Sequence, residues 1–152
     1  MLSESIEIKS NIKNNKYVKH LNDPHVKSWR AIVNSYIKIF TILEKSMRED
    51  ESVTYARFHI FFICYFEGSK APVELARRLG VTRGNMSMLI KRMVVDDHLA
   101  ICPDSESKQR PHYCLTDTSV EIFENILPGH VKKIRTLIPV LPPDFIDILN
   151  NV

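Results

Sequence analysis

The sequence has little glycine and no long apolar run. Four glycines in 152 residues disfavour an all-β fold with many tight turns. The longest uninterrupted apolar run, residues 60–66, is far shorter than the roughly 20 residues that span a bilayer. The first 20 residues are polar and lack the apolar core of a signal peptide. We therefore expect a cytoplasmic protein without a membrane partner.

Motifs for catalysis and metal binding are also missing. The three cysteines, Cys64, Cys102 and Cys114, include no CxxC pair and cannot all pair within one chain. We expect reduced thiols, although Cys102 and Cys114 fall on the two strands of a predicted hairpin, where a redox switch is the alternative. No phosphate-binding glycine loop, nucleophile elbow or HExxH motif occurs, and the six histidines form no ligand-spaced cluster. The sequence therefore predicts no enzyme, metal site or cofactor.

Positive charge is concentrated in one segment. The formal net charge is only +3, yet residues 77–95 hold five basic residues and no acidic one. The ordinary explanation of such a cluster is a solvated helix face. Because this cluster coincides with the helical pattern described below, we favour the alternative that it binds a polyanion.

The N-terminal third predicts a polar arm followed by a long helix. Residues 1–22 are polar and weakly periodic, which is typical of a flexible arm or a short helix. Asp23 and Pro24 then supply an N-cap and a first helical residue. Apolar residues follow at spacings of three and four, namely Val26, Trp29, Val33, Tyr36, Phe40, Leu43 and Met47. One broad core face explains this stripe, but additional isoleucines widen it, and we favour a role in an interface.

The central segment begins with a helix that is expected to be buried. Thr54 is a suitable N-cap for it. The run over residues 55–66 is apolar all round, and such a helix is usually buried on every side. We therefore expect this helix to lie at the centre of the core.

Two short helices joined by a glycine turn follow. A helix over residues 72–80 ends at its glycine, and Thr82 caps a second, basic helix that runs to residue 95. This arrangement predicts a helix-turn-helix. Glu74 is expected to pair with Arg77 or Arg78 at helical spacing. The inward positions of the basic helix are expected to be Met86, Leu89, Ile90 and Met93.

The remaining segments predict a hairpin and further helices. Strand-like runs at residues 99–102 and 110–115 flank a polar loop, which is the pattern of a β-hairpin. Behind a helix-turn-helix, such a hairpin is a wing. Helices are expected over residues 119–127 and 131–138, separated at Pro128 because proline interrupts helices. A short last helix follows.

These patterns together resemble the MarR family of bacterial transcriptional regulators. The resemblance rests on ELARRLGVTRGNMSMLIKRM (74–93), on the polar wing PDSESKQR (103–110), and on the strand end and helix cap CLTD (114–117). The preceding FHIFFICYFEGSKAP is similar to the helix before the motif in that family. The single segment LARRLGVT occurs in many helix-turn-helix proteins, whereas its combination with the wing and flanking helices is more specific.

The resemblance implies a mainly α fold with a small β-hairpin wing. A winged helix-turn-helix DNA-binding domain would cover residues 53–116. The N-terminal dimerisation helix would cover residues 23–52 and the C-terminal dimerisation helices residues 117–152, with residues 1–22 left as a polar arm. The family's function implies a homodimeric, sequence-specific transcription regulator, most often a repressor, on a pseudo-palindromic operator in double-stranded DNA.

The sequence departs from the family pattern after the basic helix. His98 stands where the family usually has a glycine, with one extra residue in the helix. The family's wing commonly carries Asp-x-Arg, whereas an ungapped match places Ser107 and Gln109 there, and Arg110 fits only after a one-residue shift. This altered wing favours an alternative function, a winged-helix protein–protein adaptor that has lost DNA binding. The absence of acidic residues from residues 77–95 argues against that alternative.

The basic helix supplies most of the predicted DNA contacts. Arg83 suits the O6 and N7 atoms of guanine, and Asn85 suits the N6 and N7 atoms of adenine. The wing residues Lys108 and Arg110 are expected at the minor groove. The simpler explanation for Arg83 and Asn85 is a solvated helix face, and for the wing residues it is a disordered tip that makes no contact. The outward positions of the helix and its cap are Thr82, Arg83, Gly84, Asn85, Ser87, Met88, Lys91 and Arg92.

A small-molecule site is a further expectation that the resemblance implies. Regulators of this family often bind an aromatic acid or phenol between the dimer layer and the DNA-binding domain. Tyr36, Phe40, Arg57 and His59 are the candidate lining residues here, together with Tyr55. Each of them is more often an ordinary core or surface residue, and this is the alternative for all of them.

Overall fold

A computed structural model of the chain describes residues 18–50, 53–103 and 111–151. The chain divides into two compact units, one extending to Ile42 and the other beginning at Leu43. No described helix combines the length and the apolar content that crossing a bilayer requires.

The first unit contains the short 3-10 helix η1 (Val18–Asn22) and most of the helix α2 (Pro24–Asp50). The predicted long helix is therefore present. A side-chain oxygen of Asp23 accepts the backbone N–H of His25 at 2.8 Å, so the predicted N-cap also forms. Along α2, several apolar side chains of the predicted stripe are exposed, among them Trp29 at 62% and Tyr36 at 64%.

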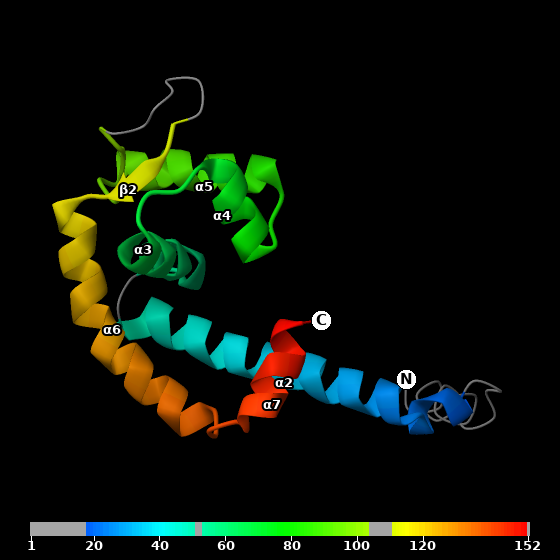
Figure 1. The fold of residues 1–152 in the computed structure, drawn as a ribbon. Helices are drawn as coiled ribbons and strands as arrows, with labels where there is room; N and C mark the ends of the chain where they lie inside the picture. The colour runs from blue at the N-terminus through cyan, green and yellow to red at the C-terminus, as the bar shows by residue number, and fades with distance from the viewer. Residues whose placement is uncertain (1–17, 51–52, 104–110, 152) are drawn as a thin grey trace, which may run out of the picture. The chain divides into compact units, whose positions relative to one another are not determined.

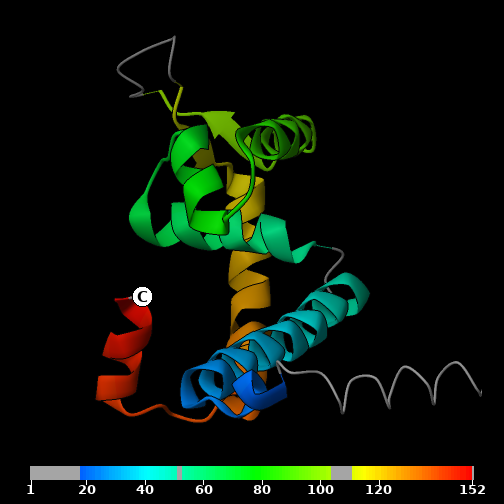
Figure 2. The same ribbon diagram turned by 90° about the vertical axis from the view of Figure 1, so that its right-hand side faces the viewer.

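The second unit contains the remaining helices and a two-stranded antiparallel sheet. Figure 1 shows α3, α4, α5 and the strands gathered at one end of α6, and Figure 2 shows the same grouping after a quarter turn. This order of elements confirms the predicted mainly α fold with a helix-turn-helix and a hairpin. The elements are α3 (Tyr55–Glu67), α4 (Pro72–Leu79), α5 (Arg83–Val95), β1 (Leu99–Ile101), β2 (Tyr113–Leu115), α6 (Asp117–Leu137) and α7 (Pro143–Asn150).

The core of this unit forms around one face of α3. Its largest fully buried side chains are Phe58, Phe61, Phe123, Ile60, Leu75, Met86, Met93 and Leu99. The other face of α3 is open, because Phe62, Tyr65 and Phe66 are all at least 39% exposed. The expectation of a helix buried on every side was therefore wrong. An apolar sequence alone does not reveal how many neighbours a helix has, and here neighbours cover only one face.

The predicted break at Pro128 is absent. α6 is one helix from Asp117 to Leu137 with this proline inside it, and Figure 1 shows it curving along its length. Proline removes one backbone hydrogen bond and crowds the preceding turn. Phe123 and Ile126 before the proline and His130 after it are all buried, so packing on both sides holds the helix together. Pro128 itself is exposed, which leaves room for its ring.

Asp97, and not His98, occupies the position after α5 that suits glycine. Its φ of +57° lies in the left-handed region that suits glycine. Asp97 therefore matches the family's glycine position, and the extra helical residue that the placement of His98 required is not needed. The N–H of His98 reaches back to the carbonyl of Met93 at 2.7 Å, as in a common helix-ending motif. The carboxylate of Asp97 accepts the hydroxyl of Thr118 at 2.8 Å, which stabilises this uncommon conformation.

The predicted pairing of Glu74 with Arg77 or Arg78 was also wrong. Glu74 turns back and accepts the N–H of Ala71 at 2.9 Å, which helps to cap α4. Arg78 instead pairs with Glu67 at the end of α3. Helix capping at the N-terminus thus outcompetes a pairing along the helix surface, because it satisfies a backbone N–H that has no partner within the helix.

The strand register keeps two cysteines out of direct opposition. Ala100 pairs with Cys114, whereas the N–H of Cys102 bonds to the carbonyl of His112. Cys102 and Cys114 therefore lie diagonally across the hairpin, farther apart than directly opposed residues. Neither forms a disulfide bond, and Cys64 forms none either. Burial raises the pKa of Cys64 to about 11, so this thiol is held in its unreactive protonated form.

Candidate nucleic-acid interface

The start of α5 is fixed by a tight turn and a cap. Gly80 has a φ of +65°, a left-handed conformation that suits glycine, and its N–H bonds to the last turn of α4. Two residues later, the hydroxyl of Thr82 accepts the N–H of Asn85 at 3.2 Å. The predicted cap is therefore present, and it defines the direction in which the first turn of α5 points.

Helix α5 has one buried face and one exposed face. Met86, Ile90 and Met93 are buried and Leu89 is half-buried, which confirms the predicted inward positions. All the outward positions that the sequence predicted on this helix are exposed, namely Thr82, Arg83, Gly84, Asn85, Ser87, Met88, Lys91 and Arg92. The structure thus brings these eight residues together on one accessible surface, which we call the α5 face.

The α5 face is cationic. The helix contains Arg83, Lys91 and Arg92 and no acidic residue. Among the described residues, none of these three cations has an ion-pair partner. Asp96, the first acid after the helix, pairs with Arg57 instead. Three positive charges are therefore available to an external anion.

The pairing of Arg57 anchors the other end of α5. Its guanidinium lies 2.5 Å from the carboxylate of Asp96 and 3.3 Å from Nδ1 of His98. Burial lowers the pKa of His98, and the adjacent charge of Arg57 lowers it further. Arg57 thereby ties α3 to the end of α5, a contact between distant segments that sequence spacing did not suggest.

The candidate effector residues lie in different parts of the chain. Tyr36 and Phe40 belong to the first unit, where their ring centroids are 5.8 Å apart. In the second unit, His59 packs against Tyr55 with ring centroids 4.3 Å apart, and burial lowers the pKa of His59. A hollow of about 330 Å³ beside the end of α5 is lined by Arg57 but by none of the other candidates. An effector site built from these residues stays a prediction.

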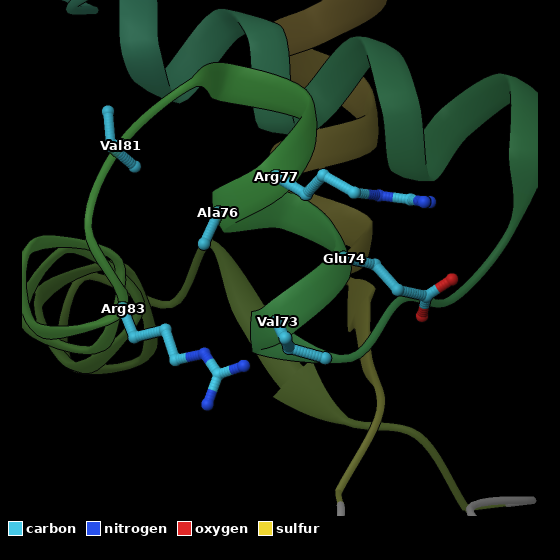
Figure 3. Close-up of a pocket in the computed structure, with 6 residues that line it drawn as sticks. All are labelled: Val73, Glu74, Ala76, Arg77, Val81 and Arg83. Carbon is cyan, nitrogen blue, oxygen red and sulfur yellow. The ribbon is translucent and has the colours of Figure 1, made fainter.

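A second hollow lies between α4 and the start of α5. Its volume is about 560 Å³, and Figure 3 shows Arg83 extending from α5 towards α4. The sequence analysis did not identify this hollow. No sequence signal pointed to it, because the exposure of the two valines that line it, Val73 and Val81, is a property of the fold. Its lining residues are Val73, Glu74, Ala76, Arg77, Val81 and Arg83.

The tip of the predicted wing lies outside the described residues. This includes Lys108 and Arg110, and also the two positions of the expected Asp-x-Arg pattern. The base of the wing is described, with β1 and β2 paired directly behind α5. Within the described part of the chain, no group of three or more His, Cys, Asp or Glu residues could hold a metal ion.

A helix-turn-helix with a basic second helix and a hairpin behind it defines the class of winged helix-turn-helix proteins. The solved structures with similar folds include MarR-family transcriptional regulators. AbsC from Streptomyces coelicolor is similar with a TM-score of 0.71 and 18% identity, over 85% of this chain and 88% of AbsC. A mutant of E. coli MarR complexed with operator DNA is similar with a TM-score of 0.67 and 20% identity, over 91% of this chain and 95% of MarR.

A third similar structure is that of Bordetella bronchiseptica BpsR, whose DNA binding is regulated by 6-hydroxynicotinic acid. Its TM-score is 0.66 at 15% identity, over 80% of this chain and 89% of BpsR. No protein-family model matches the sequence, and no curated protein matches it. The chain therefore has the fold of the MarR-family regulators, and the predicted fold is confirmed.

Proposed function

We propose that the protein is a regulator of transcription that binds double-stranded DNA through the α5 face. The observation that carries this proposal is the capped helix itself, which holds no acidic residue and exposes three cations that pair with none of the acids the structure describes. A helix of this kind fits the major groove. Its cations can bind DNA phosphates without first breaking an ion pair to a described acidic side chain. The protein would then act in the cytoplasm, where a bacterial chromosome lies.

Each part of the α5 face has a role in this proposal. Arg83 and Asn85, in the first turn, would contact guanine and adenine edges. Thr82 and the helix N-terminus would face a phosphate. A Cβ added at Gly84 would meet nothing within 4 Å, so the backbone there is open to close approach by DNA. Lys91 and Arg92 would bind backbone phosphates, which fixes register without reading sequence.

The flanking residues complete the interface. Ser87 would contribute a hydroxyl near the backbone or a base edge, and Met88 would lie towards the groove. Lys108 and Arg110 on the wing would enter or flank the adjacent minor groove, where A·T tracts strengthen the negative potential. Such wing contacts would add affinity to a helix that makes few contacts alone.

We further propose that the protein is a homodimeric repressor. The terminal helices support an interface because each exposes apolar side chains, such as Trp29 and Tyr36 on α2 and Ile148 on α7. Residues 23–52 and 117–152 would form the dimer layer, and residues 53–116 would bind DNA. Two copies would recognise a pseudo-palindromic operator with half-sites about one helical turn apart. Light scattering at micromolar concentration should give twice the chain mass of 17.6 kDa, and a monomer mass would contradict the dimer.

We also propose that a small aromatic effector regulates DNA binding. The similarly folded BpsR is regulated by such a compound. The candidate residues here remain Tyr36, Phe40, Arg57 and His59. Because Arg57 already holds Asp96, an acidic effector would have to compete with that carboxylate for its guanidinium.

A gel-shift titration against random-sequence and selected duplexes tests the main proposal. Binding should weaken steeply as salt rises, because each phosphate contact releases counterions. Replacing the three cations together, in Arg83→Ala/Lys91→Ala/Arg92→Ala, should abolish binding. The matched control is Lys9→Ala/Lys13→Ala/Lys16→Ala, which removes the same charge from residues 1–22, outside both the α5 face and the proposed dimer layer. Absent or salt-independent binding would instead favour a protein–protein adaptor.

A further inference from the structure

The α5 face has an apolar side chain at its centre. Met88 is 55% exposed, whereas Met86 and Met93 on the same helix are fully buried. Exposure of a long apolar side chain among polar and charged neighbours leaves apolar area in water, and Val94 and Val95 add to it only at the end of the helix. A partner that covers this face would remove that area from water.

The position of Met88 along the helix is informative. It lies three and four residues after Asn85 and Gly84 and four residues before Arg92, so these positions share one face. Gly84 has no side chain to shield Met88, and the space around it is open. Met88 therefore stands between the end that would read bases and the end that would hold phosphates.

We propose that Met88 reads the C5 methyl group of thymine. This inference rests on the proposed binding of α5 in the major groove. The thymine methyl is the one apolar group that a base pair presents there, while the other groups are hydrogen-bond donors and acceptors. A thioether is at most a weak acceptor, so it would leave those polar groups without a partner. The half-site should thus contain a thymine opposite Met88, in addition to the bases read by Arg83 and Asn85.

Replacement of thymine by deoxyuridine isolates this contact, because it removes the methyl group and leaves the pairing edge unchanged. The purified full-length protein would first be used to select its site from random duplex DNA. Each thymine of that site would then be replaced by deoxyuridine, one position at a time. At one position per half-site, affinity should fall about fourfold, equivalent to roughly 0.8 kcal/mol for one buried methyl group.

Variants of the protein assign the methyl contact to a residue. Met88→Ala should bind the original site more weakly than the unaltered protein does. Its affinity should fall less than twofold on the same deoxyuridine replacement. Met88→Leu keeps an apolar side chain and should retain most of the methyl dependence. Val95→Ala is the matched control, since Val95 is 85% exposed and lies two turns further along the helix. Its methyl dependence should equal that of the unaltered protein.

The outcomes separate this inference from the proposed function. A selected site without a thymine at a constant position, or equal loss in Met88→Ala and the unaltered protein, would overturn the reading of thymine while leaving DNA binding intact. Failure to select or bind any duplex would overturn both.

Discussion

At the scale of single residues, the α5 face separates side chains suited to reading sequence from side chains suited to holding the backbone. Arg83 and Asn85 lie in the first turn, where the capped helix end would enter the groove. Lys91 lies two turns further along. The same face can therefore be altered in two ways with different consequences for DNA binding.

Arg83→Ala should cost about 1–3 kcal/mol per half-site and relax specificity at one base pair of each half-site. Lys91→Ala should weaken binding to all sequences alike and reduce the salt slope by about 1 for each bound protomer. Gel shifts on the selected site and on single-base variants, at several salt concentrations, distinguish the two effects. Equal loss on every sequence for Arg83→Ala would contradict its role in reading a base.

Asp97 combines a left-handed backbone with a side-chain hydrogen bond to Thr118. Asp97→Ala removes the bond and keeps a Cβ in an unfavourable conformation, and should lower the free energy of unfolding by about 1–2 kcal/mol. Asp97→Gly also removes the hydrogen bond, but glycine adopts the left-handed conformation without strain, so the free energy of unfolding should fall by less. Urea denaturation measures both. A larger loss for the glycine variant would show that backbone conformation is not the controlling factor.

At the scale of elements, local signals predicted most helix starts and failed for some ends and faces. Thr54, Thr82 and Thr116 all act as N-caps, and such caps are readable because side chain and backbone are three residues apart. The continuity of α6 through Pro128 was not readable. It depends on buried neighbours on both sides of the proline, and those neighbours come from segments distant in sequence.

The same limit applies to the candidate site. Helical spacing alone predicted which residues of α5 face outward. The ion pair between Arg57 and Asp96 joins residues 39 apart, and no spacing rule reaches that far. The hollow beside Arg83 likewise depends on the angle between α4 and α5, and no local sequence pattern predicts that angle.

Pro128 offers a test of how packing holds α6 together. Pro128→Ala restores a backbone N–H at an exposed position, so no packed side chain is lost. The free energy of unfolding should rise by about 1 kcal/mol or more, because proline is the least favourable residue inside a helix. Thermal and urea denaturation would show the change. An unaltered or lower stability would mean that the curvature of α6 already relieves the strain.

At the scale of the whole molecule, stability should depend on pH through buried histidines. Burial lowers the pKa of His59 and of His130 from the ordinary value of 6.5, and the positive charge of Lys133 also lowers that of His130. The unfolded chain then binds protons more readily than the folded one. The free energy of unfolding should therefore be highest above about pH 7.5. It should fall as the pH drops through 6.5 towards the lowered pKa values of the folded protein.

Urea denaturation between pH 7.5 and 5.5 measures this dependence. His59→Gln/His130→Gln should reduce the slope, even if that variant is less stable at pH 7.5, and His98, whose pKa is also lowered, should account for part of the slope that remains. The control His25→Gln alters an exposed histidine and should keep the full dependence. A double variant with an undiminished slope would assign the pH dependence to other groups.

The contacts of Asp97 also have a mechanical consequence. Its carbonyl accepts the hydroxyl of Thr116 at 2.5 Å and its carboxylate that of Thr118, so the end of α5 is fastened to the start of α6. α6 extends about 30 Å from this joint, given its 21 residues. If α6 turns as a rigid rod about this joint, a sideways shift of about 3 Å at its far end corresponds to a tilt of about 6° at the joint.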